Sequence, residues 1–363
     1  MSEYQVRPFR RGDREDFLDL YERVFDRDGS NEWFDWKYAE NPYLDEVPVV
    51  VATLDGRVVG ARAFFPLAMR GADRTALALQ PADTMVHPDH RRQGLFTEMT
   101  RLGLDRYADR EPEFCFNFPN SATLSGNRKL GWQVVGSVPT CYRINDPVST
   151  LEGPDSFSKV GRAMPAAVEQ IVRARDQLAG RRRPSAEVAV SRHDDVPVDD
   201  LLAVARRTAP DRLHARRDRT FFEWRFGNPD WAYETFLARE AGRPVAAVVT
   251  GTQATGGVTV TTLCDVLPLR GCDRRGPLSA LLSRITEAFA DSELLAASPA
   301  AAPAGLMARH GFLRDDVPPL SAASDVTVMA VRPLGEASDW TFGDRRLTDG
   351  DSWRLSLAER DTR

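Results

Sequence analysis

The chain repeats itself, and this repetition restricts the possible fold more than any other feature of its 363 residues. Residues 34–42 read FDWKYAENP, and residues 222–229 read FEWRFGNP, so one single-residue gap aligns them. Two further pairs are each separated by 180 residues. Val-His-Pro at 86–88 corresponds to Val-Leu-Pro at 266–268, and Gly-Trp at 131–132 corresponds to Gly-Phe at 311–312. The landmarks keep their order in both halves, so the sequence predicts two copies of one structural unit.

Each half also has the same succession of expected elements. In the first half, apolar spacing predicts a helix over 13–25, and two β-branched runs around Asp55-Gly56 predict a hairpin. The remaining elements of this half are a strand ending at Val86, a helix over 94–107, a strand over 114–118, a helix reaching Leu130 and a strand over 132–144. Counterparts in the second half fall at 201–208, 233–239 and 244–250. The predicted fold is α/β (α+β), with a mixed central sheet flanked by helices in each unit.

The expected domain organisation follows from the repeat. We predict an N-terminal unit over 1–145, a linker carrying one helix over 146–185, a C-terminal unit over 186–335 and a tail over 336–363. The linker helix is placed at 166–178 by its apolar pattern. Aromatic residues of the tail, Trp340, Phe342 and Trp353, indicate that it packs across a face of one unit.

Composition excludes several classes of protein. With 48 Lys and Arg against 53 Asp and Glu, the formal charge is −5, which argues against a general nucleic-acid binder. No run of 18 apolar residues exists, so no membrane span is expected. The N-terminus lacks the pattern of a secretory signal, which predicts a cytoplasmic protein. Four cysteines in so long a chain are interpreted as reduced thiols rather than a disulfide framework.

The most informative stretch lies between the strand ending at Val86 and the following helix. Pro88 stops the strand, a basic loop with Arg91 and Arg92 follows, and Gly94 stands where the helix begins. The first amides of a helix have no internal partner and carry partial positive charge. A glycine allows an anion to approach them, and arginines add charge-assisted hydrogen bonds. This pattern predicts a site for a phosphate or pyrophosphate.

The same residues resemble a known family. Arg91-x-x-Gly94 after a strand ending in Val-His-Pro is similar to the acyl-coenzyme A signature of the GNAT-type N-acetyltransferases, in which Phe96 stands where the family has Gly or Ala. Asn120 and the helix ending in Lys-Leu-Gly-Trp at 129–132 resemble the family's second motif. The resemblance spans 4–145 well and 186–335 more loosely, so the chain resembles a tandem GNAT protein.

That resemblance implies a coenzyme site in the first unit only, with acetyl-CoA as co-substrate. The backbone of Met85 and Val86 would pair with the pantetheine arm like an added strand. The pyrophosphate would be surrounded by Arg91, Arg92, Gln93, Gly94, Leu95, Phe96 and Thr97, and the arm would be faced from the other side by Asn120 and Ser121. The matching second loop, 269–279, is two residues longer and carries Asp273 and Pro277, which adds negative charge and removes an amide donor.

Acyl transfer to an amine also needs a proton acceptor and a donor for the departing thiol. Asp83 is the nearest carboxylate on the strand and is the candidate base; the alternative is a buried aspartate that binds backbone. As the donor, the family often places a tyrosine four residues before the glycine of the last helix. Asn127 stands there in the first unit and Met307 in the second. The general acid is therefore missing, supplied elsewhere, or replaced by water.

Other chemically interesting residues have simpler explanations. His87 and His90 lack a third ligand, so we interpret them as surface loop residues and expect no metal. Cys115 falls on an apolar strand and is expected in the core. The aromatic residues Trp33, Trp36 and Tyr38 could line an acceptor pocket or pack in the core, and their repetition as Trp224 and Phe226 favours the core.

The sequence thus predicts an acyl-CoA-dependent N-acyltransferase that moves an acetyl group to an amine of a small molecule or sugar. Two alternatives stay open. One is a noncatalytic acyl-CoA-binding sensor or scaffold. The other is an aminoacyl transferase of the peptidoglycan type, which also consists of two GNAT units. The oligomeric state is left open, and no nucleic-acid or membrane partner is expected.

Overall fold

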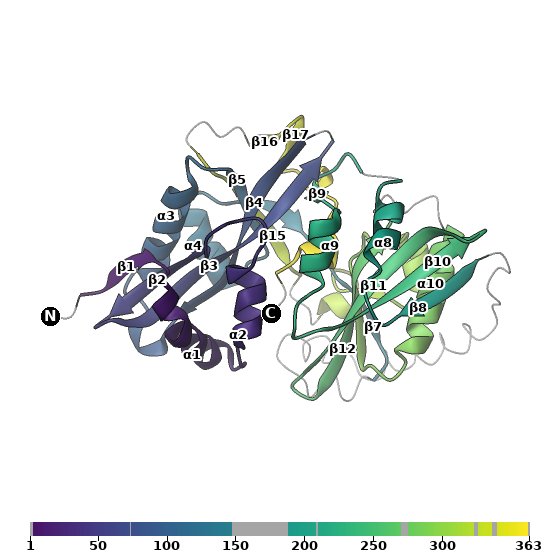
Figure 1. The fold of residues 1–363 in the computed structure, drawn as a ribbon, viewed down its shortest axis with the longest axis horizontal. Coiled ribbons are helices and arrows are strands. Elements are labelled where there is room, and N and C mark those ends of the chain that lie inside the picture. The colour runs from purple at the N-terminus through teal and green to yellow at the C-terminus, as the bar shows by residue number, and fades with distance from the viewer. Residues whose placement is uncertain are drawn as a thin grey trace.

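Two mixed sheets, each flanked by helices, make up the protein in a computed structural model that describes residues 3–72, 74–146, 188–207, 210–269, 275–322, 326–335 and 340–361 (Figure 1). The linker helix expected over 166–178 lies outside the described residues, as do Cys272 and the middle of the second loop. Figure 1 places the N-terminal unit and the C-terminal unit side by side, with the C-terminus between them.

The first sheet has the spatial order β1 (Gln5–Pro8), β2 (Val49–Leu54), β3 (Arg57–Gly71), β4 (Arg74–Val86), β5 (Pro112–Asn117), β15 (Val328–Pro333) and β6 (Gln133–Ser137), with β9 (His214–Ala215) on β3. The second has the order β14 (Leu313–Arg314), β7 (Cys141–Ile144), β13 (Leu294–Ala297), β12 (Val258–Leu267), β11 (Arg243–Thr255), β10 (Ala232–Glu240) and β8 (Ala189–His193). A small hairpin of the tail is formed by β16 (Thr341–Phe342) and β17 (Arg345–Arg346).

The helices of the first unit are α1 (Arg14–Phe25), α2 (Asn31–Phe34), α3 (Leu95–Tyr107) and α4 (Ser121–Lys129). Those of the second unit are α8 (Val198–Ala205), α9 (Arg219–Arg225), α10 (Arg275–Ala288) and α11 (Ala304–Arg309). Short helical turns complete the chain: η1 (Arg11–Asp13), η2 (Asp35–Ala39), η3 (Pro88–His90), η4 (Leu320–Ala322), η5 (Gly350–Ser352) and η6 (Leu357–Glu359). The same element order in both units confirms the predicted duplication.

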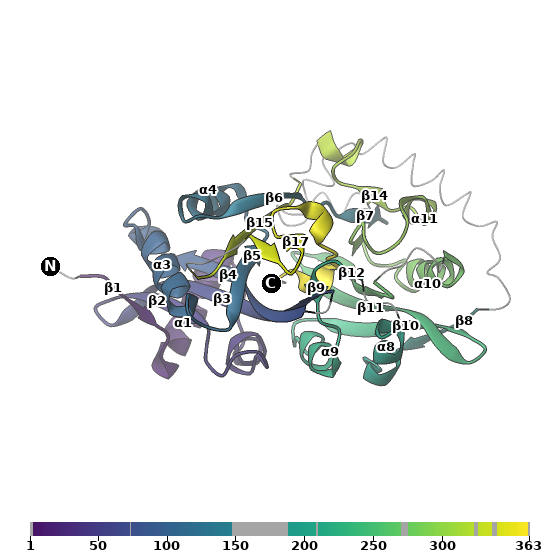
Figure 2. The same ribbon diagram turned by 90° about the horizontal axis from the view of Figure 1, so that it is seen from above.

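Side-chain alternation along β2 explains why helices cover both faces of the first sheet. Val49 and Val51 join the core under α1, whereas Val50 and Ala52 pack with residues of α3. Successive residues of a strand point to opposite faces, so a continuous apolar run must be covered on both sides. In Figure 2, α1, α8 and α9 lie on one side of the sheets, and α4, α10 and α11 lie on the other.

The hairpin turns confirm the Asp-Gly signal. Asp55 and Gly56, between β2 and β3, have φ angles of 50° and 83°, and Ala241 and Gly242, between β10 and β11, have 48° and 77°. Two consecutive positive φ angles define the turn type that matches the twist of a two-residue hairpin. The two units therefore have the same type of turn at the same place, although its sequence is Asp-Gly in the first unit and Ala-Gly in the second.

The two units exchange strands. The expected single strand over 132–144 is wrong, because the structure divides it into β6 in the first sheet and β7 in the second. In return, β15 from the second half lies between β5 and β6 of the first sheet (Figure 2). A break in the run, Val-Pro-Thr at 138–140, carries the chain from one sheet to the other. Each sheet is thus completed by the opposite half of the chain.

The repeated aromatic motif of the first unit contacts its copy in the second unit. The indole Nε1 of Trp36 donates to the carbonyl of Trp224 at 2.7 Å, and Nε1 of Trp224 donates to the carbonyl of Trp36 at 2.9 Å. The two rings stack with centroids 5.9 Å apart. Trp33, Trp36 and Tyr38 all belong to the main hydrophobic core, which confirms the core interpretation of the motif.

The C-terminal tail packs as its aromatic residues indicate. Phe342 and Trp353 both contact the ring of Phe114 on β5, and Trp353 also contacts Phe116. The tail then continues between the units, where η6 precedes the last described residue, Asp361 (Figure 2). It therefore contributes to the region where the two units meet.

Candidate active site

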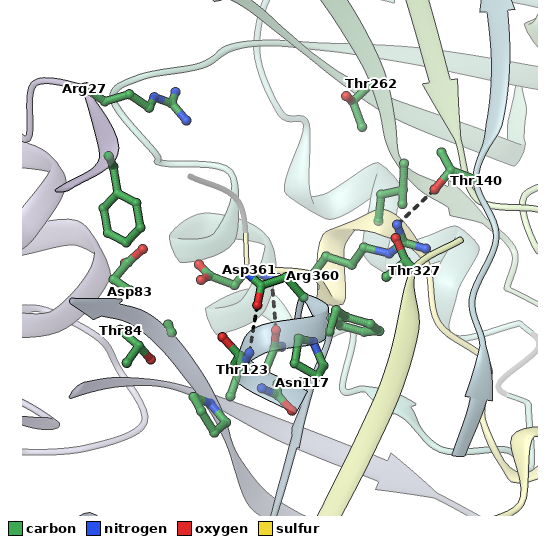
Figure 3. Close-up of a pocket in the computed structure, with 18 of the residues that line it drawn as sticks. Arg27, Asp83, Thr84, Asn117, Thr123, Thr140, Thr262, Thr327, Arg360 and Asp361 are labelled. Carbon is green, nitrogen blue, oxygen red and sulfur yellow. Dashed lines mark hydrogen bonds between the residues drawn. The ribbon is translucent and has the colours of Figure 1, made fainter. Parts of the chain in front are cut away.

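A cavity of about 1000 Å³ opens where the two units meet. Figure 3 shows it with side chains contributed by β4, by the segment from β5 to α4, by the second sheet and by the tail. The first unit supplies 80–84, Arg62 and 117–120, and the tail supplies Leu357, Arg360 and Asp361. Residues of both units therefore face the same cavity.

The cavity exists because two parallel strands separate. The pairing of β4 with β5 is confined to 77–79 on β4, after which β4 continues to Val86 paired only with β3. The His87 amide donates to the Val59 carbonyl at 2.9 Å. In an antiparallel pair, hydrogen-bonded and non-hydrogen-bonded residue pairs alternate, and the His87 bond makes Val86 and Gly60 a non-hydrogen-bonded pair. The N–H and C=O of Val86 therefore point away from β3 toward the open side, whereas Met85 pairs with Ala61. The open edge can accept an extended ligand as an additional strand.

The turn after Val86 has the geometry of an anion site. Gly94 caps α3 with a φ of 81°, and Arg92 also has a positive φ, 64°. Within the described part of the chain, no acceptor is bonded to the amides of residues 92–96. Arg91, Arg92, Gln93 and Gly94 are exposed, and Thr97 is half-buried. The first bonds of α3 run from the Thr97 and Glu98 amides back to the Gly94 carbonyl, at 2.9 and 3.1 Å. The amides in front of them are free to bind an anion.

Arg91 has an additional contact. Its Nε donates to the Val86 carbonyl at 3.3 Å, so it bridges the end of β4 and the turn. Arg92 extends from the turn without an ion pair among the described residues. Both guanidinium groups therefore add positive charge beside the free amides.

Phe96 occupies the place of a small residue in the family signature, and the structure shows how it is accommodated. Its ring packs against Gly126 of α4, where a Cβ added to the glycine would lie 2.5 Å from Phe96 Cε1. Leu95 is buried beside β2. The large ring of Phe96 on α3 therefore packs where α4 has a glycine and no side chain.

Asn120 and Ser121 lie where β5 leads into α4. The Asn120 side chain caps this helix by accepting from the Thr123 amide at 2.9 Å. Ser121 is the first helical residue and is exposed. Asn120 and Thr123 line the cavity opposite β4. Asn120 and Thr123 thus form the second wall of the strand separation, and Ser121 does not line the cavity.

Asp83 lies in the cavity wall, at a bulge of β4 where Asp83 and Thr84 together oppose one residue of β3. It is buried, with a φ of 36°. Its Oδ2 accepts from the Lys37 ammonium at 2.6 Å and from the Tyr38 hydroxyl. Burial, together with the negative charge of Asp83, raises the pKa of Tyr38 well above its ordinary value, so the phenol stays a donor. Asp83 is thus a buried carboxylate bonded to side chains.

Lys37 also reaches the tail, because its Nζ lies 2.6 Å from an Asp361 carboxylate oxygen. The ammonium is fully buried and forms ion pairs with two carboxylates. Sequence reasoning missed this contact, because Lys37 and Asp361 are far apart in the chain. The only signal in the sequence was that Lys37 is one of three lysines.

Arg62 is the other residue that the sequence did not single out. It is fully buried on β3, lines the cavity, and has no carboxylate within ion-pair distance among the described residues. Its Nη1 donates to Thr84 Oγ1, and its Nη2 lies 3.4 Å from Asn127 Oδ1. Burial lowers the pKa of this guanidinium to about 10, so it remains charged at neutral pH. An arginine inside an apolar strand run was the signal that could have revealed it.

Several residues considered from sequence lie outside this site. His87 caps η3, and His90 Nδ1 is 3.0 Å from the Tyr4 hydroxyl, at the protein surface. Cys115 is buried in the core of the first unit, where burial raises the pKa of its thiol to about 12. The described residues contain no cluster of three metal-ligating side chains. None of the described helices has the length and apolar character needed to cross a membrane.

The second unit has a corresponding strand separation, but it is filled. Beyond the pair formed by Leu263 and Ala297, β12 and β13 diverge, and tail residues 354–356 lie between them. The Ser298 hydroxyl donates to the Leu355 carbonyl at 3.0 Å, and Arg354 Nε donates to the Leu269 carbonyl at 2.8 Å. Only about 10 Å³ of space remains there. Asp273 lies outside the described residues, and Pro277 is in the first turn of α10.

Comparison with known proteins agrees with this architecture. Residues 5–135 match the family model described as an acetyltransferase (GNAT) domain. A search of curated proteins found no match.

Solved structures resemble almost the whole chain. A GCN5-related N-acetyltransferase from Anabaena variabilis ATCC 29413 has a TM-score of 0.57 at 10% identity, with 92% of this chain and 73% of that one covered. Eis1 from Mycobacterium abscessus has a TM-score of 0.51 at 13% identity, with 92% and 74% covered. A tandem GNAT protein from the clavulanic acid biosynthesis pathway has a TM-score of 0.56 at 13% identity, with 93% and 100% covered.

The N-terminal unit therefore matches a GNAT acetyltransferase domain model over residues 5–135. The chain as a whole has the fold of a tandem GNAT protein, and in this chain residues of both units line one cavity.

Proposed function

We propose that this chain is an acyl-CoA-dependent N-acyltransferase that moves an acetyl group from acetyl-CoA to an amine of a small molecule or sugar. One observation carries the proposal. Beyond Leu79, β4 is separate from β5 as far as Val86, and it leads to a turn whose amides, 92–96, have no acceptor in the described protein. An open strand edge that leads to free helix-terminal amides suits a ligand with an extended amide-containing arm and a diphosphate.

The residues present fit this coenzyme. The turn amides, Arg91 and Arg92 would hold the diphosphate, and the outward backbone of Val86 would pair with the arm. Asn120 and Thr123 would face the arm from α4. When bound, the coenzyme supplies an activated acyl group at the cavity.

The acceptor would occupy the part of the cavity between the units. Trp231, Gln253 and Thr262 of the second unit line it, together with Asp83 and Asp361. Hydroxyl, amide and aromatic groups in one wall suit a polar small molecule. The second unit would then select the acceptor, which explains why it is retained without an open strand separation of its own.

For the proton of the amine, we propose Asp83 as the acceptor, directly or through water. Its place in the cavity wall supports this role, and its ion pair with Lys37 gives it a structural role as well. Asp83→Asn should lower kcat and leave binding of free coenzyme A unchanged. A variant that binds coenzyme A less well would assign Asp83 to the architecture alone.

A noncatalytic acyl-CoA-binding role is the second candidate. The observation that favours it is Asn127, which stands where many relatives carry a tyrosine and is fully buried. The enzyme and the noncatalytic protein are distinguished by an assay of free thiol. The enzyme should release thiol from acetyl-CoA only when an amine is added. Saturable binding with no such release across a panel of polyamines, amino sugars and amino acids would favour the sensor.

The coenzyme assignment is tested by thermal unfolding with acetyl-CoA, using proline at two aligned positions. Gly94→Pro cannot adopt the observed φ of 81° and should abolish the stabilisation. Gly276→Pro is the matched control, because Gly276 lies in the first turn of α10 with open space around it. At about a hundred times the Kd, the parent and the control should gain about 2.7 kcal/mol. Equal stabilisation of all three proteins would refute the assignment.

A further inference from the structure

The proposed acyl transfer leaves a negative charge that the first unit must accommodate. The amine nitrogen forms a bond to the acyl carbon, the carbon–sulfur bond breaks, and its electron pair stays on sulfur. One proton leaves the nitrogen, and the sulfur must be stabilised as a thiolate or take up a proton. Asn127 has no acidic proton to give, so any proton that the sulfur takes up must come from another group.

Arg62 is a buried positive charge without an internal counter-charge. No carboxylate of the described residues lies within ion-pair distance of its guanidinium, and its Nε has no hydrogen-bond partner among them. Burying a charge without compensation is costly, so such a group persists where an anion completes the site. Arg62 lines the cavity, on the face of β3 that it shares with Phe64 and that packs against α3.

Thr84 connects this charge to the cavity. Its Oγ1 accepts a hydrogen bond from Arg62 Nη1, so its own hydroxyl proton must point elsewhere. Thr84 is half-buried, lines the cavity beside Asp83 and sits at the bulge of β4 (Figure 3). No acceptor for this hydroxyl is found in the described part of the protein. The proton is therefore available to a ligand along the open strand edge.

Asn127 and Phe96 hold the guanidinium in place from the helices. Asn127 Oδ1 lies 3.4 Å from Nη2, and the Arg62 guanidinium carbon lies 5.3 Å from the centre of the Phe96 ring. The residue that replaces the expected tyrosine thus contacts the buried arginine. A positive charge and an aromatic face together fix the orientation of the group that polarises Thr84.

We propose that the Thr84 hydroxyl donates a hydrogen bond to the departing sulfur, and that Arg62, through Thr84, positions and polarises this hydroxyl. This inference rests on the proposed function. Thr84 is the catalytic residue, since it touches the reacting sulfur, and Arg62 is a positioning residue. In many GNAT-type enzymes a tyrosine on the helix that corresponds to α4 stabilises the departing sulfur. Here Thr84 and Arg62 would do so from β4 and β3, on the opposite wall of the strand separation.

The test is the thiol pKa of bound coenzyme A, measured from the ultraviolet absorbance of the thiolate during a pH titration. A hydrogen-bond donor backed by a positive charge should lower this pKa by about one to three units relative to free coenzyme A. Thr84→Val, which removes only the hydroxyl, should reverse the shift, and Thr84→Ser should retain it. Thr75→Val, on the exposed end of the same strand, is the matched control and should behave as the parent.

Kinetics give a second readout. Thr84→Val should lower kcat about 100-fold with acetyl-CoA and leave its KM within about twofold, because the bond strengthens as charge develops on sulfur. Arg62→Gln should lower kcat in the same direction, provided that its melting temperature shows a folded protein.

The outcomes separate this inference from the proposed function. If coenzyme A does not bind the parent protein, the proposed function fails. If coenzyme A binds with the same thiol pKa in the parent, Thr84→Ser and Thr84→Val, the proposed function stands and the assignment of Thr84 and Arg62 is overturned. A reversed shift in Thr84→Val alone supports the assignment.

Discussion

The two units contain the same strand separation in opposite states. Between β4 and β5 it opens into a cavity of about 1000 Å³, and between β12 and β13 about 10 Å³ is left around tail residues 354–356. The chain has therefore filled one copy of the separation with its own backbone and left the other open. The open copy is also the one whose following turn carries Gly94 and free amides. The two copies therefore differ in one respect: one separation is a cavity, and the other holds a segment of the tail.

The buried charges differ in the same way. In the second unit, Arg217 is bonded to Asp265 at 2.8 Å and to Glu359 of the tail at 2.5 Å. In the first unit, Arg62 has no carboxylate within ion-pair distance among the described residues. A buried cation that is neutralised internally stabilises the fold, whereas one that is left unneutralised suits a ligand that brings its own negative charge. The tail thus provides a negative charge to the buried arginine of the second unit, as a ligand would to the buried arginine of the first.

The largest effect on this comparison is expected from Glu359→Gln. Burial acts to raise the pKa of Glu359, but the Arg217 guanidinium outweighs it and holds this pKa below its ordinary value. Arg217 keeps Asp265, but glutamine would place an NH2 group among the buried donors of Arg217, Ala215 and Ser356 that now bond to the carboxylate, so the free energy of unfolding should fall by about 3–5 kcal/mol in urea. Glu287→Gln, in the exposed pair with Arg284, is the control and should cost less than about 0.5 kcal/mol. A loss below about 1 kcal/mol for Glu359→Gln would mean that the tail is not anchored by this charge.

Leu355→Ala tests the filling of the second separation directly. Leu355 is buried between the diverging strands, so the truncation should lower the free energy of unfolding by about 2–3 kcal/mol. Val317→Ala, at an exposed position, should change it by less than about 0.5 kcal/mol. Calorimetric titration of the Leu355 variant should still find one coenzyme A per chain. A second binding site in this variant would show that the tail alone prevents binding there.

Gly126→Ala and Gly305→Ala compare corresponding helices of the two units. A Cβ on Gly126 would meet the Phe96 ring at 2.5 Å, and we expect a loss of about 1–3 kcal/mol. A Cβ on Gly305 of α11 meets nothing within 4 Å, so its higher helix propensity should stabilise the protein by about 0.5–1 kcal/mol. Phe96→Leu should relieve part of the Gly126→Ala penalty, as thermal unfolding of the double variant would reveal. Equal effects of the two alanines would contradict the packing of Phe96.

The smallest expected effect is a pH dependence of the free energy of unfolding that arises from His310 of the second unit. Burial lowers the pKa of His310, which aligns with Leu130 of the first unit, to about 4. Below about pH 6.5 the unfolded chain binds a proton that the folded chain does not, so stability should fall between about pH 6.5 and 4. We expect about 1 kcal/mol in all, because the ring is partly exposed and solvent screens its charge. Urea unfolding of His310→Gln should lack this component, and an unchanged profile would assign it to other groups.

Local patterns predicted much of the fold. The expected hairpin at Asp55-Gly56, the strand ending at Val86 and the helix after Gly94 are all found at their places. These elements depend on turn chemistry and periodicity, which act over a few residues. The repeat also predicted that Trp36 and Trp224 are equivalent, although not that they bond to each other.

Contacts between distant segments were beyond such reasoning. Exchange of β7 and β15 leaves no local signal, because each strand fits either sheet by pattern. The same is true of Lys37 with Asp361 and of Arg62 with Thr84, since the pairing depends on which strands are neighbours. The loop of the candidate site was thus predictable, while the charges around its cavity needed the tertiary structure.

Hydrogen exchange of the backbone amides with and without coenzyme A tests the central claim most directly. The account predicts that coenzyme A slows exchange at Val86 and at 92–96, and leaves 263–269 and 276–282 unchanged. Protection in the second unit instead, or unchanged exchange at 92–96 under saturating coenzyme A, would contradict the claim that only the first separation receives a ligand.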